Sequence, residues 1–184
     1  MPNLVRRREL LTFGAAAGLA AIAAPAWAQR LDIWEPRRAV LHNLHTGEAF
    51  DEVYYANGSY LPDALAEANR VMRDWRTGDQ TFIDPGLFDA LHAVQQKLEA
   101  SGPFQIISGY RSPATNAALH ARSSGVASKS LHMRGMATDL RVQGVDLAHV
   151  RKAALSLGRG GVGYYPRSNF VHVDTGRVRQ WAGA

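Results

Sequence analysis

The spacing of hydrophobic residues changes along the chain between the period of a strand and the period of a helix, and this succession constrains the fold more than any other feature. Residues 39–45 and 49–55 alternate between apolar and polar positions, which predicts two strands joined by a hairpin turn at Thr46-Gly47-Glu48. Apolar spacing or capping residues predict helices over residues 62–76, 85–100, 113–121 and 147–157. Further short strands are predicted at residues 104–107, 136–142, 161–165 and 169–174. This order predicts an α+β fold with a central antiparallel sheet backed by helices.

The start of the chain has the features of an export leader. Arg6-Arg7-Arg8 forms a positive region, residues 10–24 form a short apolar run, and Ala26-Trp27-Ala28 fits a cleavage site. The apolar run is shorter than the roughly 20 residues that a membrane-spanning helix needs. We also expect no transmembrane segment in the mature chain.

The leader also resembles a twin-arginine export signal, because Arg7-Arg8 is followed by Glu9-Leu10-Leu11. A general secretory signal or an uncleaved anchor are the alternatives. We therefore expect an export signal over residues 1–28, one domain over residues 29–184, and a periplasmic location.

The net charge is positive but mild. The 184-residue chain has 21 basic and 16 acidic residues, and removal of the leader's three arginines and one glutamate leaves 18 and 15, a formal charge of +3. No basic cluster with interleaved aromatic residues is visible, so we expect no nucleic-acid partner despite the pI near 9.9. A modest positive balance favours an anionic polymer such as the cell wall.

The sequence contains no cysteine, so a metal site must use histidine, carboxylate or backbone oxygen ligands. His132 and Asp139 are seven residues apart, which suits a loop that carries the histidine into a strand that carries the carboxylate, with Gly135 at the turn. His172 lies in another strand, which could place it beside Asp139. Three protein ligands and an open position are typical of catalytic zinc. Spacing alone also allows three unrelated polar residues.

Three further patterns occur in a fixed order along the chain. They are Ser108-Gly109-Tyr110-Arg111-Ser112, then Ser130-x-His132-x-x-Gly135-x-Ala137-x-Asp139, then Gly163-Tyr164-Tyr165 with Phe170-Val171-His172-Val173-Asp174-Thr175-Gly176. Together they resemble the motifs of the zinc D-Ala-D-Ala peptidases, a superfamily that includes D,D-dipeptidases, D,D-carboxypeptidases, murein endopeptidases and the Hedgehog fold. The resemblance covers nearly all residues after the leader and is strongest to the murein endopeptidase K branch.

The resemblance implies that His132, Asp139 and His172 bind zinc on the face of the sheet. It implies that Arg111 stabilises the oxyanion that develops when water attacks a peptide carbonyl. A structural salt bridge is the alternative for Arg111. The implied substrate is a peptidoglycan stem peptide, cross-linked between two diaminopimelate residues or from D-Ala to diaminopimelate.

The same resemblance makes Ser130 and Tyr110 substrate-binding candidates, and Tyr164 and Tyr165 are candidates for the groove wall. The alternative for Ser130 is a hydroxyl that shapes its loop. For each tyrosine the alternative is packing in the core.

One departure from the family pattern concerns the general base. Related enzymes often have a carboxylate or histidine two or three residues before the third ligand, where this chain has Asn169 and Phe170. Asp174 lies two residues after His172, on the same face of a strand, and could act either as the base or as a partner that orients a ligand such as His172, or Arg111. His120 is a further candidate base.

Two other functions are compatible with the same sequence. A D,D-carboxypeptidase or dipeptidase would use the same metal site and release free D-Ala. A non-catalytic, zinc-containing wall-binding module could retain the ligands without a base.

Overall fold

The computed structural model describes residues 34–99, 101–123 and 125–183, so the expected export leader over residues 1–28 lies outside the described residues. The strands are β1 (Arg37–Asn43), β2 (Ala49–Ala56), β3 (Ser59–Tyr60), β4 (Phe104–Ser108), β5 (Ala137–Val142), β6 (Gly161–Tyr165), β7 (Phe170–Asp174) and β8 (Arg179–Ala182). The helices are α1 (Pro62–Val71), α2 (Pro85–Leu98), α3 (Pro113–Arg122), α4 (Leu147–Ser156) and the short 3-10 helix η2 (Leu131–Arg134). Within these ranges, no helix combines the length and the apolar character needed to cross a bilayer.

All eight described strands form one sheet in the order β3-β2-β1-β4-β5-β7-β6-β8. Most neighbours are antiparallel, but β1 pairs with β4 and β6 pairs with β8 in parallel. The predicted α+β class is confirmed, and the sheet is mixed rather than wholly antiparallel. The parallel β1–β4 pair follows from the long connection between them, which holds β2, β3, α1 and α2 and returns the chain in the same direction.

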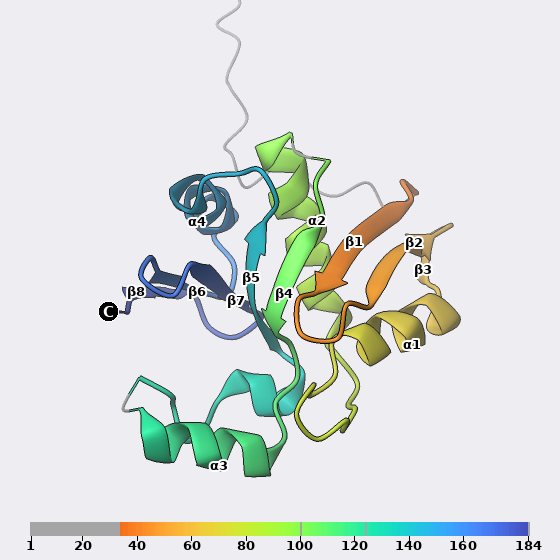
Figure 1. Cartoon of the computed structure of the whole chain (residues 1–184). Coiled ribbons are helices and arrows are strands. Elements are labelled where there is room, and N and C mark those ends of the chain that lie inside the picture. The colour runs from red at the N-terminus through yellow and green to blue at the C-terminus, as the bar shows by residue number, and fades with distance from the viewer. Residues whose placement is uncertain (1–33, 100, 124, 184) are drawn as a thin grey trace, which may run out of the picture.

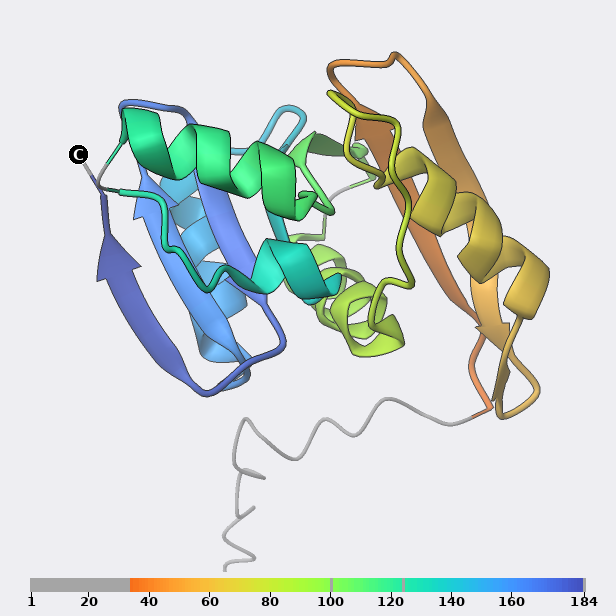
Figure 2. The same cartoon turned by 90° about the horizontal axis from the view of Figure 1, so that it is seen from below.

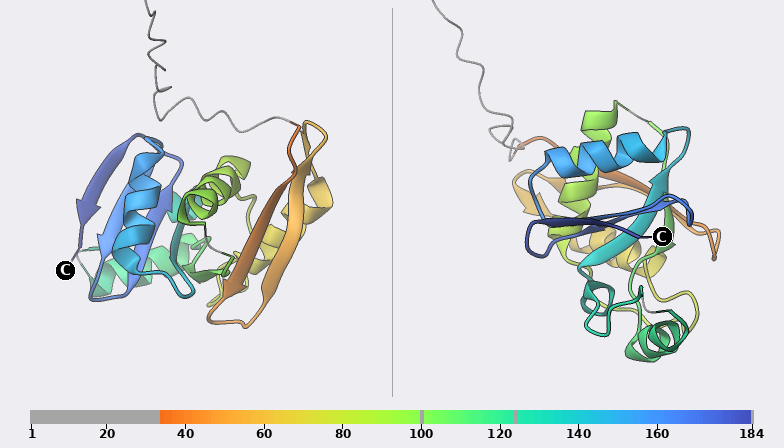
Figure 3. Two further views of the ribbon diagram at one scale, coloured as in Figure 1. Left: turned by 90° about the horizontal axis from the view of Figure 1, so that it is seen from above. Right: turned by 90° about the vertical axis from the view of Figure 1, so that its left-hand side faces the viewer.

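The helices lie on both sides of the β5–β7 region of the sheet. α4 covers one face, whereas α3 and η2 lie on the opposite side (Figures 1 and 2). α2 lies beside α4, and α1 packs against β1 and β2 at the other end of the sheet (Figure 3). The face of β5 and β7 turned away from α4 is therefore the face that α3 and η2 approach.

The helix α2 shows how local sequence and burial agree in the core. The Asp84 side chain accepts a hydrogen bond from the Gly86 N–H at 2.9 Å, and Pro85 occupies the first helical position. Phe88 and Leu91, on the apolar face of the helix, are fully buried. Burial of each such side chain contributes roughly 1.5–3 kcal/mol.

The helix α1 ends at Val71, five residues before the predicted end. Tertiary contacts replace the helix beyond this point. The Asn43 side-chain amide donates to the Val71 carbonyl at 2.8 Å, and the Tyr110 N–H donates to the Met72 carbonyl at 2.7 Å. These bonds satisfy carbonyl groups that a helix end otherwise leaves free, and they tie the end of α1 to the segment after β4.

Candidate metal centre

His132 is carried by the short helix η2, in a segment where the sequence predicted a loop. The Ser130 hydroxyl accepts a bond from the His132 N–H at 3.4 Å and so caps this helix. Gly135 ends the helix at φ +65°, and an added Cβ would lie 2.3 Å from the Phe82 carbonyl oxygen. Only glycine fits this turn without displacement, and the turn leads directly into β5.

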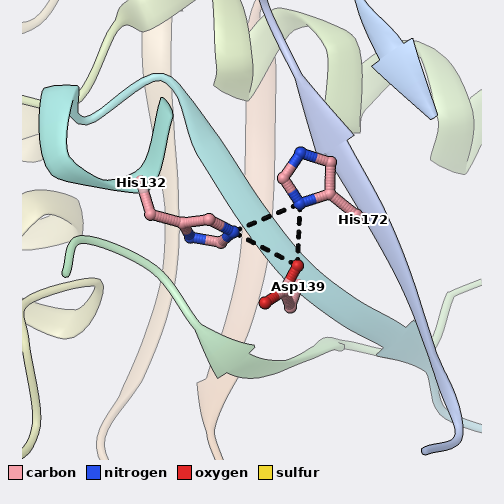
Figure 4. A group of neighbouring side chains, drawn as sticks. All are labelled: His132, Asp139 and His172. Carbon is pink, nitrogen blue, oxygen red and sulfur yellow. Dashed lines mark hydrogen bonds and ion pairs between the residues drawn. The ribbon is translucent and has the colours of Figure 1, made fainter. Parts of the chain in front are cut away.

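Asp139 and His172 are direct partners in the antiparallel pair β5–β7, as predicted from the two strand patterns. The side chains of both residues meet that of His132 on one face of the sheet (Figure 4). The Asp139 Oδ1 atom lies 2.9 Å from His172 Nδ1 and 3.2 Å from His132 Nε2, and the two nitrogens are 3.2 Å apart. One atom from each residue thus lies within 4.8 Å of the other two.

Each imidazole is oriented by a hydrogen bond at its other nitrogen. His132 Nδ1 donates to the Gly109 carbonyl at 2.7 Å, and His172 Nε2 donates to Asp174 Oδ2 at 3.0 Å. The nitrogens that face the cluster are therefore the ones available to bind a metal. Two ligands at about 2.1 Å from a tetrahedral ion lie roughly 3.4 Å apart. The observed separations are close to this value, so the three residues fit a metal with two nitrogen ligands and one oxygen ligand.

Burial and proximity perturb the pKa of each group in the cluster. Burial lowers the pKa of the His132 imidazole, an effect that Asp139 opposes. Burial alone would raise the pKa of the Asp139 carboxyl, but the two histidines hold it well below its usual range. Burial also opposes charge on His172, yet the hydrogen bonds to Asp139 and Asp174 raise the pKa of its imidazole to about 9.

Arg111 lies directly beside the cluster. Its Nη2 donates to Asp139 Oδ2 at 3.3 Å and to the Ser108 hydroxyl at 3.4 Å, and its Nη1 donates to Asn116 at 3.4 Å. All three bonds are long, and the buried Nε has no partner among the described residues. The guanidinium is thus held in place while several of its donors are weakly used.

Asp174 lies behind His172, and its side chain is completely buried. Burial alone would raise the pKa of its carboxyl, but His172 and Arg179 hold that pKa below its usual range. Its oxygens also accept bonds from the Gly161 and Gly176 N–H groups at 2.9 and 2.8 Å. The carboxylate is therefore ionised and fully hydrogen-bonded.

Comparison with known proteins identifies the family of this chain. A family model described as "Peptidoglycan L,D-endopeptidase MepK" matches residues 32–181. The chain belongs to this family. The protein named "Peptidoglycan L,D-endopeptidase MepK" in Escherichia coli (strain K12) is 49% identical over 176 residues, which cover 95% of this chain and 96% of the relative. A "Probable peptidoglycan L,D-endopeptidase MepK" from Haemophilus influenzae is 42% identical over 150 residues, 81% of each chain.

The two residues predicted to bind substrate, Ser130 and Tyr110, each make contacts within the protein, and their contact with substrate stays a prediction. The Ser130 hydroxyl caps η2, and the Tyr110 ring packs against the core while its N–H binds the Met72 carbonyl. Tyr164 also packs against the core, and Tyr165 stacks on Phe170 with their ring centroids 4.5 Å apart.

The candidate base His120 lies on α3, where its Nδ1 is hydrogen-bonded to the Val126 carbonyl. Asn169 is in the turn before β7 at φ +55°. Among the described residues, His120 does not belong to the group of possible metal ligands.

Arg179 and Trp181, which the sequence motifs did not single out, also contact the site. Arg179 binds Asp174 at 2.6 Å, and the Trp181 and His172 ring centroids lie 5.2 Å apart. Both belong to β8, a four-residue strand. In the sequence, the two residues are marked only by their spacing of two, which is typical of a strand. A pattern of two residues is too short to predict a contact with the site.

Proposed function

We propose that the chain is an exported, zinc-dependent peptidoglycan endopeptidase. The observation that carries this proposal is the convergence of His132, Asp139 and His172, with two oriented imidazoles and one carboxylate on one face of the sheet. Two histidines and one carboxylate are ligands that suit catalytic zinc. The names of the relatives from Escherichia coli and Haemophilus influenzae support the substrate class.

The bond in the proposed substrate joins an L-centre to a D-centre, as in a cross-link between two diaminopimelate residues. When bound, zinc would supply a Lewis acid that lowers the pKa of water and polarises the peptide carbonyl. Arg111 would donate to the oxygen that becomes negative, using the guanidinium N–H groups that its long bonds leave weakly engaged. Asp139 would hold both this arginine and the metal, because one oxygen faces each.

Of the two roles considered for Asp174, orientation of His172 is the better supported. A carboxylate has about four lone-pair positions. Here they meet donors from His172, Arg179 and two backbone N–H groups. A buried carboxylate with this set of partners has no free position from which to accept a proton from water.

Digestion of purified sacculi tests the proposed function, with the muropeptides separated after incubation. We expect cross-linked dimers to be converted to monomers by wild-type protein, and His132→Ala to abolish this conversion. His92→Ala is the matched control, because His92 lies on α2 and contacts the Arg38 carbonyl. Release of D-Ala with persistent dimers would indicate a D,D-carboxypeptidase instead. Wall binding without any cleavage would indicate a non-catalytic module.

The proposal includes export of residues 29–184 to the periplasm after removal of residues 1–28. Substitution of Arg7 and Arg8 by lysine is expected to retain the protein in the cytoplasm if the twin-arginine route is used. Fractionation of cells and determination of the mature N-terminus measure this. Normal export of the double lysine variant would contradict the twin-arginine route.

A further inference from the structure

The strand β8 contributes two side chains that converge behind His172. Arg179 and Trp181 are two residues apart, so both lie on the same face of the strand. The guanidinium carbon of Arg179 lies 5.0 Å from the centroid of the Trp181 ring. The two side chains thus form one contiguous unit at the edge of the sheet, next to β6.

The first contact of this unit with His172 runs through Asp174. Arg179 Nη2 and Nη1 bind Asp174 Oδ2 and Oδ1 at 2.6 and 3.0 Å, a two-pronged arrangement that fixes the plane of the carboxylate. The same Oδ2 atom accepts the hydrogen bond from His172 Nε2 at 3.0 Å. Arg179 therefore sets the position of the oxygen that orients the imidazole.

The neighbouring backbone leaves room for this ion pair. A Cβ added to Gly161 would lie 2.4 Å from Arg179 Nη1 and 2.5 Å from Asp174 Oδ2. Any side chain at this position would displace the pair. The Gly161 N–H donates to Asp174 as well, so this glycine both admits and anchors the carboxylate.

The second contact is made by the Trp181 ring. Gly163 pairs with His172 on one side and with Trp181 on the other, which puts the three residues in line across β7, β6 and β8. Because Gly163 has no side chain, the indole extends over it toward His172; an added Cβ would lie 2.6 Å from the ring. The indole N–H donates to the Tyr165 hydroxyl at 2.8 Å, which fixes the ring in this pose.

We propose that β8 is the positioning element for His172, the third ligand of the proposed zinc site. Arg179 acts through Asp174 at Nε2, and Trp181 packs against the imidazole ring, so that Nδ1 stays directed at Asp139. The inference rests on the proposed function only in that it needs zinc to bind at this cluster. Arg179 and Trp181 are thus positioning residues rather than ligands.

Zinc affinity of the purified chain, measured by competition with a chromophoric chelator, tests the proposal. We expect Arg179→Met and Trp181→Ala each to raise the zinc Kd about tenfold, since loss of a partner behind a metal-binding histidine typically costs roughly 10–100-fold in affinity. Arg179→Lys should restore part of the loss. The control is Arg167→Met, which removes an exposed arginine from the turn between β6 and β7 and should leave the Kd unchanged.

A double-mutant cycle identifies the route by which Arg179 acts. In an Asp174→Asn background, Arg179→Met should add less than about a twofold further change, because its effect passes through the carboxylate. Gly163→Ala should mimic Trp181→Ala by displacing the indole. The visible absorption spectrum of the cobalt(II)-substituted chain should shift in these variants, a change that loss of stability alone would not produce.

The outcomes separate the inference from the proposed function. The role of β8 is overturned if Arg179→Met and Trp181→Ala bind zinc with wild-type affinity and leave the cobalt spectrum unshifted, while His172→Ala loses binding. The zinc site itself would then stand. The role of β8 is likewise overturned if these variants lower only the melting temperature of the metal-free chain. Absence of zinc binding in the wild type would refute the proposed function itself, and the role of β8 with it.

Discussion

In the metal-free chain, His172 is expected to make stability depend on pH. The hydrogen bonds to Asp139 and Asp174 raise the pKa of its imidazole from 6.5 to about 9, and its side chain is only 11% exposed. A group whose folded-state pKa is raised stabilises the fold fully below its unfolded pKa and loses this contribution as the pH rises through the folded value. The contribution is therefore present below pH 6.5 and lost by about pH 9.

The magnitude follows from the shift. At about 1.36 kcal/mol per pKa unit, the change from 6.5 to about 9 corresponds to roughly 3 kcal/mol. In the folded chain, the pKa values of the Asp139 and Asp174 carboxyls and of the His132 imidazole are all lowered from ordinary values of 6.5 or less. These groups therefore stay deprotonated in the folded chain throughout this window, and in the unfolded chain only His132 titrates, at its lower edge. The loss between pH 6.5 and 9 is thus assigned to His172.

Urea unfolding of the EDTA-treated chain at several pH values measures this effect. The free energy of unfolding should fall by roughly 3 kcal/mol from about pH 6.5 to 9 in wild type, and by much less in His172→Gln. Because a metal must displace the proton on Nδ1, zinc affinity should also rise about tenfold per pH unit over this range. Equal pH dependence of unfolding in the two proteins would refute the reasoning.

Three substitutions probe other parts of the molecule. Arg111→Met should lower kcat about 10²–10³-fold in a muropeptide assay with zinc content unchanged, because it removes the donor to the oxyanion; a change in KM alone would contradict this role. Asp89→Asn should lower the free energy of unfolding by about 3 kcal/mol in urea titrations, because it breaks the largely buried ion pair with Arg37, and zinc affinity should not change. Gly135→Ala should lower both stability and zinc content, measured by thermal melting and metal analysis, because its Cβ would meet the Phe82 carbonyl at 2.3 Å; wild-type zinc content would show that the turn tolerates a side chain.

Local sequence signals predicted the elements that place the site. An alternating pattern around His172 and a buried-strand pattern around Asp139 indicated two strands, and these strands pair so that the two residues are direct partners. Asp84 correctly marked the start of α2, since its cap depends on atoms only two residues away. Such features are encoded within a few positions, and period and capping rules therefore recover them.

Features that depend on distant contacts were not predicted. The helix α1 stops at Val71 because Asn43 and Tyr110, from β1 and the segment after β4, bind carbonyl groups at its end. In the parallel pair of β6 and β8, Gly163 lies opposite Trp181 and leaves room for its ring. No local sequence pattern predicts either contact, because the partners lie far apart in the sequence.

The most direct test of the central claim is a zinc titration of the EDTA-treated chain, with opening of a purified diaminopimelate-linked muropeptide dimer as the readout. We expect no cleavage in the metal-free chain, a rate that rises linearly up to one equivalent of zinc, and no recovery in His132→Ala or His172→Ala. Cleavage that persists in the metal-free wild type, or full recovery in either histidine variant, would contradict a metal centre formed by His132, Asp139 and His172.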